Sequence, residues 1–136
     1  VLVRTLFAQG AKISYLMEMV SALNSRLLAA LYGFCLPKPL REGACLLVLG
    51  SEGRREQILK TDQDNALILA PGADPAAYAE AMARFAARLA EIGYPPCAGG
   101  VMASNPHWRQ TLDGWHRRIA EWRRRGDPVA MMELSM

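Results

Sequence analysis

Two short apolar segments separated by a polar connection constrain the fold most strongly. Cys45–Leu49 and Asn65–Leu69 are five residues each, and the first lies between Gly43 and Gly50. Runs of this length bounded by glycine favour buried strands over helices. The connection from Gly50 to Lys60 is too long for a tight hairpin, so we expect a turn there, with room for a short helix. This connection is where we expect the chemistry to lie.

Helical patterns account for most of the remaining chain. Lys12 to Tyr32, Asp74 to Gly93 and the segment after Asn105 carry apolar residues three or four apart, the period of a one-sided helix. The second helix ends at its glycine, and Gly126-Asp127-Pro128 breaks the third. Val129 to Met136 is predicted to be a strand or the start of one. The predicted buried faces are Ile13, Leu16, Met17, Val20, Leu23, Leu27 and Leu31; Tyr78, Met82, Phe85, Leu89 and Ile92; and Trp108, Leu112, Trp115, Ile119 and Trp122.

This order of elements predicts a single α+β domain spanning residues 1–136. Residues 1–40 form an N-terminal segment with the long helix, and residues 41–136 form a small mixed β-sheet covered by helices and bearing the site. A hydrophobic content of 51% is enough for a core of ordinary size. No apolar run approaches the roughly 20 residues needed to cross a bilayer, and residues 1–10 have no secretion signal. A soluble, cytoplasmic protein is therefore expected.

The cysteines and the basic residues point to no separate function. Cys35, Cys45 and Cys97 are far apart and form no Cys-x-x-Cys pair, so reduced structural thiols are expected. The net charge is +3, and five arginines lie within residues 117–125. Cations near a helix C-terminus complement its dipole, so we favour a solvated face over a nucleic-acid interface. The tryptophans are likewise predicted to be core residues and not a base-stacking platform.

The polar connection contains the groups that hold phosphate. Gly50 and Gly53 have no side chains, so backbone amides can approach an anion closely. Ser51 adds a hydroxyl donor. Arg54 and Arg55 add guanidinium groups that can donate paired hydrogen bonds to phosphate oxygens. One of these two arginines could instead pair with a neighbouring glutamate, and both interpretations stay open.

Two carboxylates follow the connection. Asp62 and Asp64 precede the second predicted strand, and residues two apart on a strand point to the same face. Adjacent unpaired carboxylates repel each other, and a cation bound by oxygen ligands removes that repulsion. Magnesium is the usual such cation beside phosphates, and two metal ions can assist a phosphoryl transfer. Asp62 and Asp64 are therefore the predicted magnesium ligands and catalytic residues.

These motifs together resemble a known superfamily. Gly50-Ser51, ten residues and then Asp62-x-Asp64 is similar to the signature of the polymerase-beta-like nucleotidyltransferases. The wider strings, residues 50–57, 61–65, 99–106 and 108–110, resemble one branch of it. That branch is a nucleotidyltransferase domain found beside CBS and cyclic-nucleotide-binding modules, and it is similar to the uridylyltransferase domain that acts on the PII signalling protein. The resemblance covers nearly the whole chain.

The resemblance implies specific roles for the site residues. Gly50 and Ser51 would bind the triphosphate, and Asp62 and Asp64 would bind magnesium. The implied reaction transfers a nucleoside monophosphate to an acceptor hydroxyl, on a protein or a small molecule, and releases pyrophosphate. One departure is Gln63, where the superfamily usually has an apolar residue, but strand alternation directs Gln63 away from the metal site.

The resemblance also implies a third carboxylate near the metal. Glu133 is the candidate in this chain because it falls in the last predicted strand, whereas Asp113 and Asp127 do not. In the resembling branch the segment equivalent to residues 131–136 is followed by aromatic residues and an aspartate. We therefore expect either Glu133 or a residue beyond Met136 to fill this role, and the chain to be part of a longer multidomain protein.

Two further functions stay open beside the enzyme. A non-catalytic module could bind nucleotide and report it to CBS or cyclic-nucleotide-binding modules in the parent chain. A nucleic-acid-binding domain could use the arginine-rich helix, with a steep loss of binding as salt rises. The base of the triphosphate, the acceptor and the oligomeric state do not follow from the sequence.

Overall fold

A three-stranded mixed sheet organises the fold in the computed structural model, which describes residues 2–55 and 62–135. Its strands are β1 (Ala44–Val48), β2 (Asn65–Leu69) and β3 (Arg109–Thr111), in the order β1-β2-β3. β1 runs antiparallel to β2 with Leu47 opposite Ala66, and β3 runs parallel to β2. The first two strands and the α+β class are confirmed. The third strand is absent from the sequence-based prediction.

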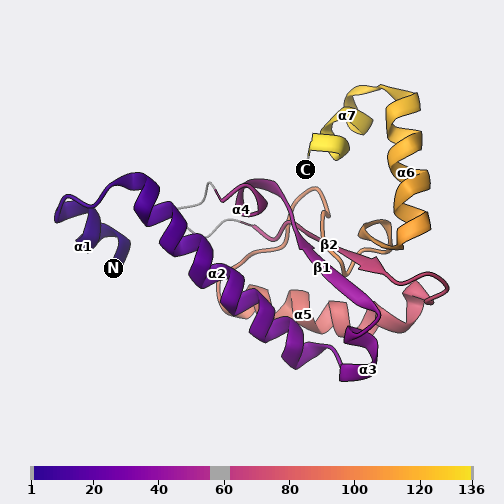
Figure 1. The fold of residues 1–136 in the computed structure, drawn as a ribbon, viewed down its shortest axis with the longest axis horizontal. Coiled ribbons are helices and arrows are strands. Elements are labelled where there is room, and N and C mark those ends of the chain that lie inside the picture. Colours follow the sequence, from indigo (N-terminus) through magenta and orange to yellow (C-terminus); the bar gives the residue numbers. More distant parts are fainter. Residues whose placement is uncertain (1, 56–61, 136) are drawn as a thin grey trace.

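The described residues form nine helical segments, and α1 with the start of α2 extends away from the strands (Figure 1). The longest, α2, confirms in part the helix predicted from Lys12 to Tyr32, because it continues to Cys35 and is preceded by the helix α1, which was not predicted. The four-residue α4 confirms the short helix expected after β1. The bounds are α1 (Leu2–Ala8), α2 (Ile13–Cys35), α3 (Lys38–Arg41), α4 (Gly50–Gly53), η1 (Pro75–Tyr78), α5 (Ala79–Glu91), η2 (Pro106–Trp108), α6 (Leu112–Arg125) and α7 (Pro128–Ser135). None of these helices combines the length and the apolar character of a membrane-spanning segment.

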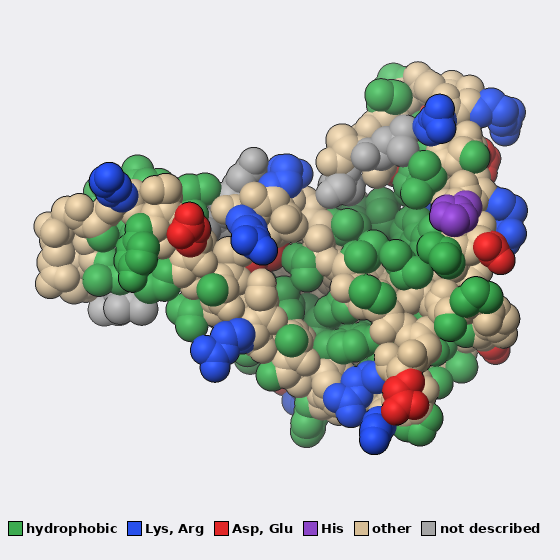
Figure 2. Space-filling view, viewed as in Figure 1, with side chains coloured by type: hydrophobic (Ala, Val, Ile, Leu, Met, Phe, Trp, Pro, Cys, Tyr) green, Lys and Arg blue, Asp and Glu red, His purple; other side chains and the backbone are tan. Residues whose placement is uncertain are grey.

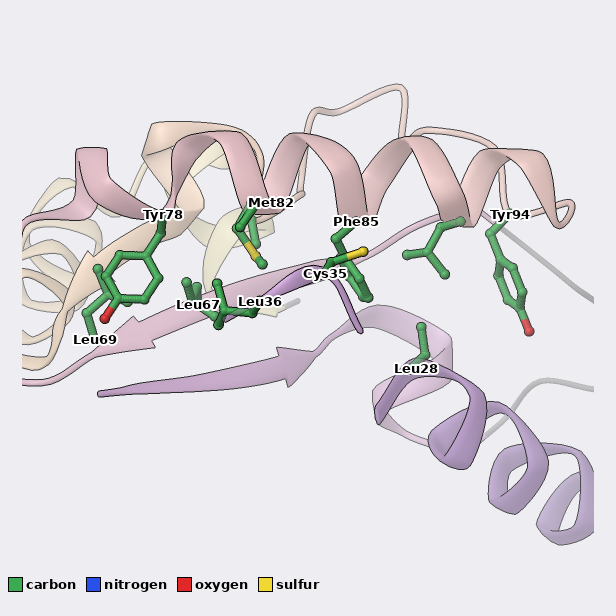
Figure 3. Close-up of a cluster of buried hydrophobic side chains, with 12 residues drawn as sticks. Leu28, Cys35, Leu36, Leu67, Leu69, Tyr78, Met82, Phe85 and Tyr94 are labelled. Carbon is green, nitrogen blue, oxygen red and sulfur yellow. The ribbon is translucent and has the colours of Figure 1, made fainter. Parts of the chain in front are cut away.

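One face of the sheet packs against α2 and α5. Figure 3 shows Tyr78, Met82 and Phe85 pointing from η1 and α5 toward Leu67 and Leu69 of β2, and all five side chains are buried. Asp74 Oδ1 accepts a hydrogen bond from Ala76 N at 2.9 Å and so caps this helical segment as expected. Of the predicted buried face, Ile92 alone is exposed, at 38%.

The buried face of α2 differs from the predicted one. Ile13 and Leu23 are 51% exposed and Leu27 is 39% exposed, so the predicted apolar face is wrong at these positions. The residues that α2 buries are Leu16, Ser21, Asn24, Leu28 and Cys35. The helix is therefore turned by about one residue toward a stripe that includes two polar side chains. One of these polar side chains, Asn24, makes two long-range hydrogen bonds.

The opposite face of the sheet carries the tryptophan cluster. Trp108, Trp115 and Trp122 are at most 7% exposed, and Trp115 Nε1 donates to Leu67 O at 3.0 Å, which confirms these residues as core. Leu112 and Ile119, predicted as buried, are 41% and 40% exposed. They line a groove of about 310 Å³ between the sheet and α6. Figure 2 shows hydrophobic side chains gathered in the hollow beside α6 and α7, which project from the rest of the fold.

Two helix boundaries near the C-terminus correct the prediction. The helix expected from Asn105 begins only at Leu112, because η2 and β3 occupy the residues between them and Thr111 caps α6 through Gly114 N. Residues 128–135 form α7 and not a strand. Asp127 Oδ1 accepts a hydrogen bond from Ala130 N at 2.9 Å, with proline at the first helical position. Asp-Pro therefore starts a helix here, as it does at Asp74.

Candidate functional site

The turn after β1 packs directly on the second aspartate. Gly50 has a φ of 60°, in the left-handed region that favours glycine, and a Cβ atom at Gly50 would overlap the carboxylate of Asp64. Leu49 N donates to Asp64 O at 2.9 Å and extends the pairing of β1 with β2 by one step. Two segments that the sequence separates by ten residues are thus in van der Waals contact. The predicted phosphate turn and the predicted metal ligands form one site.

Gly53 is required by packing within the turn. A Cβ atom at Gly53 would lie 2.5 Å from Val48 O, and the Gly53 amide already donates to Leu49 O at 3.0 Å. This close approach accounts for glycine at the position without a ligand. A role for Gly53 in phosphate binding stays a prediction.

The carboxylates of Asp62 and Asp64 lie close to the thiol of Cys97. One ligand atom from each of these three residues lies within 4.8 Å of the other two. Burial raises the pKa of the Asp64 carboxyl above its usual value, and the charge of Asp62 raises it further, while the Cys97 hydrogen bond and the charge of Arg54 lower it. Asp64 Oδ1 is buried and has no hydrogen-bond partner among the described residues. An oxygen in this state fits a cation ligand.

The magnesium fit rests on the two aspartates. Carboxylates are hard oxygen ligands, and magnesium in such sites usually completes its shell with substrate phosphates and waters. Cys97 is a soft donor of the kind that zinc prefers. Burial raises the pKa of its thiol in the absence of a metal. Asp62 and Asp64 therefore suit magnesium, and Cys97 does not.

Cys97 is a site residue that sequence reasoning missed. Its position depends on a parallel bridge between Gln63 and Pro96, in which Gln63 N donates to Pro95 O at 2.9 Å. This bridge aligns the loop after α5 with the aspartate segment. No local pattern in the sequence signals such a pairing, because the two segments are more than 30 residues apart. Cys97 was expected to be a structural thiol without a site.

Gln63 holds the aspartate segment from the opposite side. The side chain is 3% exposed, and its Nε2 donates to Ala86 O at 3.0 Å and to Tyr94 O at 2.8 Å. The Gln63 amide is therefore directed toward α5. The amide is thus anchored between two backbone carbonyls, which fixes the residue between Asp62 and Asp64.

Replacing Gln63 by glutamate should destabilise the domain strongly. The isosteric carboxylate has no proton to donate to the two carbonyls, so we expect the free energy of unfolding at pH 7 to fall by about 3 kcal/mol. Protonation restores a donor, so this loss should shrink as the pH is lowered. Urea unfolding at pH 7 and pH 5 measures both effects. Gln110→Glu is the matched control, because Gln110 Nε2 donates at an exposed position to Pro106 O. Equal effects of the two substitutions would contradict the anchoring role.

The two arginines predicted to bind phosphate lie at the surface of the protein. Arg54 and Arg55 follow the turn and are exposed, and Arg55 has a φ of 58°. Glu52, one possible partner for them, accepts a hydrogen bond from Asn24, and Glu56, the other, lies outside the described residues. All of residues 56–61, which belong to the motif, lie outside the described residues. Phosphate binding by the two arginines stays a prediction.

Glu133 lies apart from the aspartate group. Its Oε1 is 3.1 Å from His107 Nε2, beside the tryptophan groove. Asp113 is exposed on α6, and Asp127 caps α7. Within residues 2–55 and 62–135, the third potential ligand beside Asp62 and Asp64 is a thiol and not a carboxylate.

Comparison with protein-family models gives one match. Residues 1–129 match the model described as "Putative nucleotidyltransferase DUF294". Searches of curated proteins and of solved structures found no match. The matched region contains the turn, both aspartates and Cys97.

Proposed function

We propose that this chain, which belongs to the putative nucleotidyltransferase family DUF294, transfers a nucleoside monophosphate from a nucleoside triphosphate to an acceptor hydroxyl. The acceptor oxygen attacks the α-phosphorus and loses its proton. The bond from that phosphorus to the β-phosphate oxygen breaks, and pyrophosphate leaves. The acceptor class, a protein side chain or a small molecule, and the association with CBS or cyclic-nucleotide-binding modules are part of the proposal.

The observation that carries the proposal is the contact between Gly50 and Asp64. It brings the backbone of the glycine turn against the Asp64 carboxylate. In the proposal, Gly50, Ser51 and the two following arginines bind the phosphates. Magnesium held by Asp62 and Asp64 would neutralise the charge that the phosphates carry.

Charge explains why a divalent cation is needed. Asp62, Asp64 and Glu52 all line the same small cavity behind the turn. A triphosphate brought beside three carboxylates is repelled unless a cation lies between them. We therefore expect triphosphate binding to require magnesium, and not merely to be improved by it.

A thermal-shift screen of the four ribonucleoside triphosphates, with and without magnesium, tests this function. One triphosphate should raise the melting temperature only when magnesium is present, because ligands that bind the folded state stabilise it. Pyrophosphate release under the same conditions then separates turnover from binding. No magnesium-dependent shift with any triphosphate would refute the proposal.

A nucleotide-sensing module without turnover is the second candidate. The third potential ligand among the described residues is a thiol, whereas the resemblance to the superfamily implies a third carboxylate, and this difference favours the module. In this case magnesium-dependent binding would be measured without pyrophosphate release. Nucleic-acid binding has less support, because Arg118 donates to His107 O and Arg125 pairs with Asp127.

A further inference from the structure

A buried polar side chain of α2 reaches the predicted phosphate turn. Asn24 is 9% exposed, and its Nδ2 donates to Glu52 Oε2 at 2.8 Å. Its Oδ1 accepts a hydrogen bond from the Tyr94 hydroxyl at 2.7 Å. Glu52 lies in α4, between the two glycines of the turn. Through these two hydrogen bonds, Asn24 connects α2 with the turn and with the segment that follows α5.

The turn needs such an external anchor. It has only four residues, two of which are glycine, and glycine adds conformational freedom to the backbone. Glu52 is the longest side chain within it, and this side chain points inward to Asn24 and not to solvent. A hydrogen bond to a carboxylate is stronger than one between neutral groups. The Asn24–Glu52 pair is therefore a contact able to hold the turn against α2.

The same region connects the turn with the aspartates. Glu52, Gln63, Asp64 and Tyr94 all line one cavity of about 20 Å³. The charge of Glu52 also contributes, after burial, to the raised pKa of Tyr94. Displacing Glu52 would therefore alter both the turn and the surroundings of the metal ligands.

We propose that Asn24 is a positioning residue for nucleotide binding: through Glu52 it holds the glycine turn where the triphosphate is bound. This inference rests on the proposed function. It also explains why α2 buries Asn24 where the apolar pattern would place leucine. The position of α2 then sets the affinity of the site, although α2 contributes no ligand to the phosphates.

The test uses two isosteric substitutions and their combination. Asn24→Asp keeps the acceptor for Tyr94 but places a carboxylate against Glu52, and it should weaken magnesium-dependent binding of triphosphate by at least about tenfold. The double variant Asn24→Asp/Glu52→Gln again pairs one carboxylate with one amide, with the donor and acceptor exchanged. It should restore affinity to within about threefold of the parent. Leu23→Ala, at the adjacent exposed position of α2, is the control and should bind as the parent does.

Affinity for each of the four ribonucleoside triphosphates with magnesium is measured by calorimetry, and stability by urea unfolding. If Asn24 had only a structural role, its substitution would lower the free energy of unfolding but leave the triphosphate affinity of the folded protein unchanged. This result would overturn the inference. Failure of the double variant to recover affinity would also overturn it. If Asn24→Asp does not fold, Asn24→Ala removes the hydrogen bond without adding charge and should weaken binding about fivefold. A parent that binds no triphosphate refutes the proposed function itself, whereas a parent that binds and an Asn24 variant that binds equally refute only this inference.

Discussion

Replacing Asp62 and Asp64 together by asparagine should abolish magnesium-dependent triphosphate binding and leave the folded domain at least as stable as the parent. The amide has the shape of the carboxylate but no charge, so it loses the cation. Substitutions that disturb only the outer shell of a metal site cost about 10–100-fold in affinity, so removal of both ligands should exceed about 100-fold. Calorimetry with magnesium and the triphosphate found in the screen measures this loss. Binding equal to that of the parent would show that the metal assignment is wrong.

The pH dependence of stability gives an independent check on the same variant. Burial and the charge of Asp62 raise the pKa of Asp64 in the folded state. A carboxyl whose folded pKa is raised destabilises the fold when it is ionised, and this destabilisation is relieved as the pH falls through that pKa. Without magnesium, the double variant should therefore be more stable than the parent at pH 7. The difference should shrink as the pH is lowered toward 4, as measured by urea unfolding.

The local parts of the site were predictable because their signals are local. The strands flanking the connection are apolar runs bounded by turn residues, and the short helix after Leu49 follows from a turn too long for a hairpin. The spacing of Asp62 and Asp64 is likewise a property of one segment. Strand alternation predicts a direction for Gln63, and in the structure its amide donates hydrogen bonds to Ala86 O and Tyr94 O.

The parts that failed depend on contacts between distant segments. The apolar pattern of α2 favours a face with Leu23 and Leu27, but α2 buries Asn24, which forms hydrogen bonds with Glu52 and Tyr94 from distant segments. Cys97 reaches the aspartates through a bridge formed by Gln63, which no local pattern predicts.

The two errors near the C-terminus have different causes. β3 is only three residues long and exists because it pairs with β2, so its own sequence carries little signal. α7 was predictable, because Asp127-Pro128 repeats the helix start at Asp74-Pro75 but was interpreted only as a break.

Replacing Gly50 by alanine should weaken triphosphate binding by at least about 100-fold, whereas Gly72→Ala should leave it intact. Both glycines have a left-handed φ, 60° at Gly50 and 78° at Gly72, so alanine strains the backbone by about 1–2 kcal/mol in each case. The surroundings differ. A Cβ atom at Gly72 would meet nothing within 4 Å, but a Cβ atom at Gly50 would overlap the Asp64 carboxylate. The loss of stability should therefore be larger at Gly50, and only there should the metal ligand be displaced.

Binding affinity distinguishes this effect from strain alone. Gly50→Ala should lower magnesium-dependent triphosphate affinity by at least about 100-fold, since it moves a metal ligand and also obstructs the approach of the backbone to phosphate. Gly50→Val, with a branched side chain, should bind no triphosphate. Ser51→Ala removes one hydrogen bond to a charged partner and should cost about tenfold or less. Calorimetry at a temperature where urea unfolding shows every variant to be folded gives the comparison. If Gly50→Ala binds as well as Ser51→Ala does, Gly50 is needed for the shape of the turn alone, and the contact with Asp64 does not define the binding site.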